Sequence, residues 1–321
     1  MRLWRDVLAN TIEGYLGELR AALAGADPAL VQDAVYDAEE YLRSAAAEGG
    51  STPEAVAAAI DAYGAPTEVA QAYRDAEITV AAALRGPAPA AHRAQMGGGF
   101  LGRFFGVVAD PSAWGSLFYL LLSLVTGVIY FTLVVTGVSV TLGTLVLIVG
   151  IPLALLFLGM VRAVSFAEGR IVEGMLGVRM PRRPRSSGVE GSLWQRIKGW
   201  LTDYRTWTTM LYMMLQLVLG TIYFTALITM LSVAFAFVAW PLVSVATGLP
   251  FAMTFNYEVH LFWWAVPLFM AGGALLFVAT LWLAKGIGFL HGAYAKFMLV
   301  GSVDAEAASA VAPTAEGGVA S

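Results

Sequence analysis

The chain has 321 residues, of which 58% are apolar and only 13% are charged. A soluble globular domain is about 45–50% apolar and about 25% charged, so this composition excludes an ordinary soluble protein. The charge is also divided: residues 1–84 carry 5 basic and 14 acidic side chains, whereas residues 85–321 carry 14 basic and 9 acidic ones. An acidic first part and an apolar, basic second part indicate a water-soluble domain joined to a membrane domain.

Residues 1–84 have the apolar periodicity of a compact helical domain. The pattern predicts four helices, near residues 4–24 and 28–47, between Ser51 and Gly64, and near residues 66–84. Asp27, followed by a proline, is the expected N-cap of the second helix. Ser51 and Glu54 have the spacing of a capping box at the start of the third. The acid-rich face of the second helix is compatible with a solvated surface or with a protein-binding surface.

A linker rich in Ala, Pro and Gly over residues 85–99 leads to four long apolar segments. Because a helix needs about 20 residues to cross the hydrocarbon core, these segments predict four spans. The spans are expected near residues 115–135, 141–162, 209–232 and 262–285, with a turn at residues 136–139 joining the first two. No acidic or basic side chain lies at membrane depth in these predicted spans, which disfavours a proton or ion pathway.

The distribution of basic residues predicts the orientation. Residues 162–205 carry nine Lys or Arg against four acids, whereas the loop 241–261 has only Glu258 and His260 as ionisable groups. By the positive-inside rule, the basic segment is cytoplasmic, and four spans then place both termini in the cytoplasm.

The membrane part contains an internal repeat. Residues 100–132 and 193–225 share 13 identities in 33 aligned positions at an offset of 93, and after the first hairpin the offset becomes 123. We therefore expect two tandem units of the same orientation, each an interfacial helix followed by two spans. The predicted parts are residues 100–178, a basic linker 179–192, residues 193–300 and a tail 301–321. The expected fold is all-α: a small helical domain plus a four-helix transmembrane domain built from two tandem hairpins.

Several polar and aromatic residues are candidate membrane contacts. Tryptophans just before the predicted spans or in the interfacial stretch 193–204 are typical interface anchors: Trp114, Trp194, Trp200 and Trp207. A basic cluster is expected to face lipid headgroups rather than nucleic acid: Arg182, Arg183, Arg185, Arg196 and Lys198. Polar residues repeated within the spans fit helix packing better than ligand binding: Tyr130, Thr132, Tyr223 and Thr225.

The sequence offers little for catalysis. The chain has no cysteine and three widely spaced histidines, so we expect no catalytic residue, metal site or cofactor. The outer loop holds one polar cluster that an envelope ligand could contact: Asn256, Tyr257, Glu258 and His260. Two ionisable groups are too few to predict a metal centre there. The sequence therefore favours a protein that is not an enzyme.

Particular motifs resemble two known families. Asp37-x-Glu39-Glu40-Tyr41-Leu42 and Gly64-Ala65-Pro66 resemble the HAAS signalling domain of bacterial membrane proteins. Asp110-x-x-x-Trp114, Gly150-Ile151-Pro152-Leu153 and Asp203-x-x-x-Trp207 resemble the four-span sensor region of bacterial signalling proteins.

The resemblance implies an integral sensor or regulator in the bacterial inner membrane. Such a protein would couple a membrane or envelope signal to a cytoplasmic protein through residues 1–84, and HAAS proteins are often encoded beside PadR-type transcription regulators. The alternative is an accessory subunit of a transporter or envelope-assembly complex. The lipid bilayer is an expected partner in both cases, direct nucleic-acid binding is not expected, and a homo-oligomer is compatible with the sequence.

Overall fold

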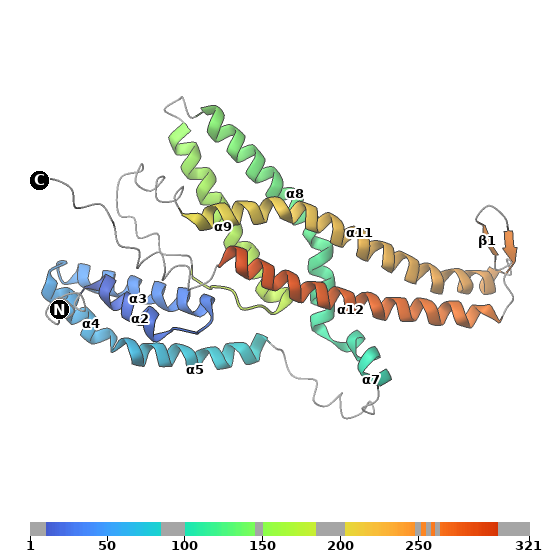
Figure 1. Cartoon of the computed structure of the whole chain (residues 1–321), viewed down its shortest axis with the longest axis horizontal. Helices are drawn as coiled ribbons and strands as arrows, with labels where there is room; N and C mark the ends of the chain where they lie inside the picture. Colours follow the sequence, from blue (N-terminus) through green and yellow to red (C-terminus); the bar gives the residue numbers. More distant parts are fainter. Residues whose placement is uncertain are drawn as a thin grey trace, which may run out of the picture.

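The computed structural model describes residues 11–84, 100–144, 150–183, 203–247, 252–254, 258–260 and 264–300. Within these ranges the chain is almost entirely helical, as predicted. Figure 1 shows a bundle of short helices at the N-terminal end beside a larger group of long helices. We call them the N-terminal domain (residues 11–84) and the membrane domain (residues 100–300, where described).

The N-terminal domain contains four helices around one small core. They are α2 (Ile12–Ala22), α3 (Pro28–Glu48), α4 (Pro53–Tyr63) and α5 (Pro66–Leu84). Tyr15, Leu19 and Leu42 are completely buried between them. The Tyr15 hydroxyl also donates to the Gly64 carbonyl (2.9 Å), which ties α2 to the end of α4. Burial raises the pKa of Tyr15 to about 12, with a further contribution from Tyr63.

One predicted cap is confirmed and one is wrong. Asp27 caps α3, because its Oδ1 accepts from the backbone N–H of Ala29 (2.9 Å). The capping box from Ser51 does not form. Ser51 has a left-handed backbone (φ 57°), and Thr52, which is extended, accepts the bond from the Ala55 N–H (3.2 Å). The polar run therefore caps the helix one residue later than its spacing indicated.

Four helices of the membrane domain are long and apolar enough to cross a bilayer. They are α8 (Pro111–Thr144), α9 (Gly150–Leu176), α11 (Tyr204–Thr247) and α12 (Ala265–Leu299). Large apolar side chains stand exposed on their outer faces, for example Phe118, Phe235 and Phe289 at 68, 74 and 72%. Such surface is unfavourable in water and suited to lipid. The predicted four-helix membrane fold is thus confirmed.

The predicted turn at residues 136–139 is wrong, because α8 continues to Thr144 and α9 begins at Gly150. A Cβ on Gly137 would overlap the ring of Phe157 on α9. The small residues that resembled a turn therefore allow two helices to approach closely, as in many membrane proteins. Before α8, the short helix α7 (Phe100–Phe105) and the 3-10 turn η1 (Gly106–Ala109) occupy the position of the first predicted interfacial helix. The second, near 193–204, lies outside the described residues except for its end.

Helices α8 and α11 cross at a pair of glycines. A Cβ on Gly127 would lie 2.7 Å from the carbonyl oxygen of Gln216, and one on Gly220 would lie 2.6 Å from the carbonyl carbon of Ser123. Gly127 and Gly220 are separated by the 93-residue offset, and so are Ser123 and Gln216. Residues at corresponding positions of the two units therefore make corresponding contacts. From this region the two hairpins diverge (Figure 1).

The second hairpin ends in two short strands that the sequence did not predict. Strand β1 (Ala252–Thr254) pairs antiparallel with β2 (Glu258–His260), so that Thr254 is opposite Glu258. Figure 1 shows these strands at the end of α11 and α12 that is remote from the N-terminal domain.

Candidate functional site

The segment after α9 lies between the two domains and contacts both of them. We call residues 177–183 the strap. Its Met180 is completely buried, and a Cβ on Gly169 of α9 would lie 3.7 Å from the Met180 Cβ. A Cβ on Gly292 of α12 would lie only 2.5 Å from Val178 Cγ2. The strap thus packs on α9 and α12, and the absence of a side chain at Gly292 leaves room for Val178.

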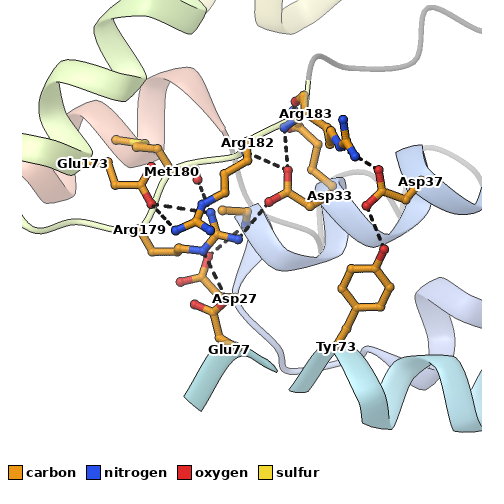
Figure 2. A network of polar contacts seen from close by, with 12 residues as sticks. Asp27, Asp33, Asp37, Tyr73, Glu77, Glu173, Arg179, Met180, Arg182 and Arg183 are labelled. Atoms are coloured by element: carbon orange, nitrogen blue, oxygen red, sulfur yellow. Dashed lines mark hydrogen bonds and ion pairs between the residues drawn. The ribbon is translucent and has the colours of Figure 1, made fainter. Parts of the chain in front are cut away.

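Arg179 is the central residue of the strap. Its side chain is only 9% exposed, yet it contacts acids of both domains. It donates to Asp33 of α3 (2.8 Å) and to Glu77 of α5 (3.1 Å), and its Nη1 lies 3.7 Å from Glu173 at the end of α9 (Figure 2). Burial lowers the pKa of Arg179, but the hydrogen bonds that it donates to Asp33 and Glu77 outweigh this effect and raise the pKa above its ordinary value. The guanidinium is therefore always charged.

Asp33 receives further hydrogen bonds from the strap backbone. Its Oδ1 accepts from the N–H groups of Arg182 (2.7 Å) and Arg183 (2.8 Å), while its Oδ2 accepts from Arg179. A buried carboxylate with donors on both oxygens is well compensated for the loss of water. The backbone contacts also require the strap to lie along α3, and not only to carry positive charge (Figure 2).

Other acids of α3 extend the same interface. Asp37 forms an ion pair with Arg183 (2.7 Å) and accepts from the Tyr73 hydroxyl of α5 (2.8 Å). Asp27, besides capping α3, forms an ion pair with Lys296 near the end of α12. The acidic face of the N-terminal domain thus contacts two elements of the membrane domain.

The acidic face of α3, which we expected to be solvated or to bind a partner, is divided in the structure. Asp33 and Asp37 contact the strap of the same chain, whereas Glu40 is exposed. Arg182 and Arg183, which we expected to face lipid headgroups, form ion pairs with Glu173 of α9 (3.6 Å) and Asp37 of α3 (2.7 Å), and about half of each side chain stays exposed. Their contact with lipid stays a prediction. Arg185, Arg196 and Lys198 lie outside the described residues.

A second polar group is buried among the long helices. Glu168 of α9 is completely inaccessible to solvent. Its Oε1 accepts from the hydroxyls of Tyr119 (2.6 Å) and Tyr212 (2.9 Å), and its Oε2 accepts from that of Tyr130 (2.6 Å). The phenols come from α8 and α11, so the carboxylate of one helix is held by hydroxyls of two others. Such residues inside a membrane domain are costly and usually functional.

His291 of α12 completes this cluster. Its Nε2 lies 2.9 Å from the Tyr119 hydroxyl and 3.3 Å from that of Tyr212, and the Tyr223 ring packs edge-on against it. Glu168 and His291 are separated by the 123-residue offset of the repeat. The tyrosines form corresponding pairs too, since Tyr119 matches Tyr212 and Tyr130 matches Tyr223 at an offset of 93. We call these six residues the Glu168–His291 cluster.

Glu168 was not among the predicted site residues, because our predicted second span ended at Arg162, whereas α9 continues to Leu176. Its carboxylate bonds to Tyr130, which we expected within the first span. The repeat contained a usable signal. Glu168 stands between Phe166 and Gly169, whose repeat partners Phe289 and Gly292 flank His291.

The remaining candidates are separated from each other. Thr132 and Thr225 are exposed on helix surfaces, away from the cluster that contains Tyr130 and Tyr223. Trp114 and Trp207 are 41 and 56% exposed, and the Trp114 indole N–H donates to the Val108 carbonyl (2.9 Å). Glu258 and His260 lie on β2. Trp194, Trp200, Asn256 and Tyr257 are outside the described residues.

Comparison with known families agrees with this architecture. The family model Sensor, described as "Putative sensor", matches residues 119–299, more than half of the chain. The chain belongs to the Sensor family. The HAAS family model matches residues 14–72, within the N-terminal domain. Comparisons with curated proteins and with solved structures give no match.

The two matched regions contain the two sites just described. The Sensor region includes the strap and all six residues of the Glu168–His291 cluster. The HAAS domain supplies Asp27, Asp33 and Asp37 to the interface. The expected combination of a HAAS domain and a membrane sensor domain is therefore confirmed, and the protein is a membrane protein of sensor type.

Proposed function

We propose that this Sensor protein is a non-enzymatic receptor that controls whether its own HAAS domain is docked or free. In the docked state the strap occupies the acidic face of α3. A change in the packing of the membrane domain would move the strap, free this face, and let it bind a cytoplasmic protein. The observation that carries the proposal is the position of Arg179, which contacts Glu173 of α9 and both Asp33 and Glu77 of the N-terminal domain.

The energetics suit a switch. Removing one partner of a buried ion pair costs about 3–5 kcal/mol, because the other charge stays buried without compensation. A change of a few kcal/mol in the membrane domain is therefore comparable with the cost of losing one such pair, and is enough to redistribute docked and free states. A signal can produce that change only if it binds the two states with different affinity.

We propose the bacterial inner membrane as the location, with the HAAS domain and both termini in the cytoplasm. The basic character of residues 162–205 supports this orientation through the positive-inside rule. The strands β1 and β2, including Glu258 and His260, would then face the envelope side. That placement keeps the outer loop as a candidate contact for an envelope ligand.

The partner proposed for the free HAAS domain is a soluble protein with a basic surface, such as a PadR-type regulator. The strap, which is basic, already demonstrates the chemistry that the acidic face accepts. The alternative is an accessory subunit of a transporter or assembly complex. In that case the docked HAAS domain would serve only as a structural element.

Co-purification of the full-length chain separates these functions. We would compare the wild type with Arg179→Ala, and use Arg103→Ala, at an exposed arginine of α7, as the matched control. A receptor predicts that one soluble protein is recovered several-fold more with Arg179→Ala than with the other two. Recovery of the same membrane subunits with all three chains would support the alternative and contradict the receptor.

A further inference from the structure

We propose that the Glu168–His291 cluster is a proton-binding site, and that the proton is the ligand that changes the docking of the HAAS domain. This inference rests on the proposed function, since it names the signal to which the strap would respond. It is based on the direction of the hydrogen bonds in the cluster and on the contacts of the residues that directly follow Glu168 and His291.

With Glu168 as a carboxylate, the short contacts of the cluster fix the positions of its protons. Both oxygens of Glu168 then accept from phenols. The single proton of Tyr119 is then given to Glu168. His291 must therefore donate through Nε2–H to the Tyr119 oxygen. Its other nitrogen, Nδ1, is left as a buried acceptor with no hydrogen-bond partner among the described residues.

One added proton reverses this chain of bonds. A proton from water binds His291 Nδ1, the Nε2 proton passes to the Tyr119 oxygen, and the former Tyr119 proton passes to Glu168 Oε1. The products are a neutral Glu168, an intact Tyr119 phenol and a neutral His291 protonated on Nδ1. The net change is one bound proton and the loss of one buried negative charge. In a low-dielectric interior the two states differ strongly in the contacts that they favour.

The side chains around the Glu168 carboxylate come from all four long helices. Helix α8 contributes Tyr119 and Tyr130, and α11 contributes Tyr212. Helix α12 contributes His291, against which the rings of Tyr223 and Tyr294 pack. On α9 itself, Arg170 and Glu173 follow Glu168 and pair with each other.

The site is directly connected to the strap. Gly169, next to Glu168, contacts Met180 of the strap, and Gly292, next to His291, contacts Val178. Arg179, which holds the HAAS domain, is the residue between Val178 and Met180. A change in the separation or rotation of α9 and α12 at this site therefore changes the surface on which the strap packs.

A pocket lies close to the site. A pocket of about 170 Å³ lies between the strap, α9 and the start of α11, and its lining includes Ser165, Gly169 and Thr209. Ser165 and Gly169 flank Glu168 on α9, and Thr209 is one helical turn before Tyr212. Water in this pocket could deliver a proton from the side of the HAAS domain.

Double electron–electron resonance on the full-length chain in lipid nanodiscs tests the proposal. Spin labels at Ala72→Cys on α5 and Ala293→Cys on α12 report docking, because both positions are exposed and the chain has no other cysteine. As the pH falls from about 8 to about 5, the ratio of free to docked domain should rise at least about tenfold. Glu168→Gln, which mimics the neutral state, should be largely free at every pH.

Acid could also loosen docking by protonating Asp27, Asp33, Asp37, Glu77 or Glu173 at the interface. Glu168→Gln leaves all of these unchanged, so a variant that keeps the wild-type pH response would overturn the proposal. If Glu168→Gln does not fold, Tyr119→Phe removes the connecting hydroxyl and should shift the midpoint of the response. An unchanged midpoint would also overturn it.

Infrared difference spectroscopy supplies a readout that does not depend on docking. Acidification of the wild type should produce the C=O band of a protonated buried carboxyl group. The band should be absent in Glu168→Gln and present in Glu39→Gln, the matched change at a buried acid of the HAAS domain. If Arg179→Ala frees the domain but neither the band nor the pH response is seen, the proton site fails and the receptor function stands.

Discussion

Asp110, just before α8, forms a salt bridge with Lys285 of α12, with 2.6 Å between Oδ2 and Nζ. The corresponding residues of the repeat form the reciprocal pair, in which Arg162 of α9 lies 3.4 Å from Asp203 before α11. The acid just before the first long helix of each unit thus binds a base on the second long helix of the other unit. The two hairpins are held together by crossed contacts, and not only by the crossing of α8 and α11.

The Asp110–Lys285 pair predicts a pH dependence of stability. Burial raises the pKa of Asp110, but hydrogen bonds from Lys285 and Ser112 outweigh it and hold the pKa below its ordinary value. A lowered pKa stabilises the fold above the unfolded value of about 4, and the contribution is lost as the pH falls through the lower, folded value. Acid should therefore lower the free energy of unfolding of the wild type.

Lys285→Ala should remove that contribution. Because the pair is partly exposed, the expected loss at neutral pH is about 1 kcal/mol or less. Thermal unfolding in detergent at several pH values checks this prediction. The difference in melting temperature between the wild type and the variant should become smaller as the pH falls below about 4. A difference that is constant with pH would show that Lys285 acts through packing alone.

The glycine crossing predicts a steric effect. In Gly220→Ala the new methyl group would meet the backbone of Ser123 and Leu124, so the helices must separate. The expected cost is about 1–3 kcal/mol. Gly143→Ala is the control, since a Cβ there has open space in the same kind of helix. Equal melting temperatures for the two variants would contradict the close crossing.

The corrected cap predicts an asymmetry between neighbours. Thr52→Ala removes the acceptor for the Ala55 N–H and should destabilise the HAAS domain by about 1 kcal/mol. Ser51→Ala should cost much less if Ser51 makes no capping bond. Hydrogen exchange of the α4 amides in the full-length chain measures both effects. A larger effect of Ser51→Ala would show that Ser51, and not Thr52, caps α4.

The proposed orientation predicts which cysteines a membrane-impermeant thiol reagent can reach in intact cells. Thr254→Cys on β1 should be labelled, and Ala72→Cys on α5 should be labelled only after the membrane is opened. The reverse pattern would place the HAAS domain outside the cell and exclude a cytoplasmic partner.

The sequence predicted features that depend on local or repeated patterns. Apolar length predicts the four spans, Asp27 before Pro28 predicts a cap, and the offset of 93 anticipates the match of Gly127 with Gly220. It did not predict where α8 ends, because Gly137 has the same local pattern in a turn and in a helix crossing. The partners of Asp33 were also hidden, since Arg179 is 146 residues away and only the docking of two domains brings them together.

The central claim is that Arg179 holds the HAAS domain against the membrane domain. The most direct measurement is the distance distribution between spin labels at Ala72→Cys and Ala293→Cys in the full-length chain at neutral pH, with and without Arg179→Ala. We expect one narrow distribution for the wild type and for the control Arg103→Ala, and a broad distribution shifted to longer distances for Arg179→Ala. Identical narrow distributions in all three chains would contradict it.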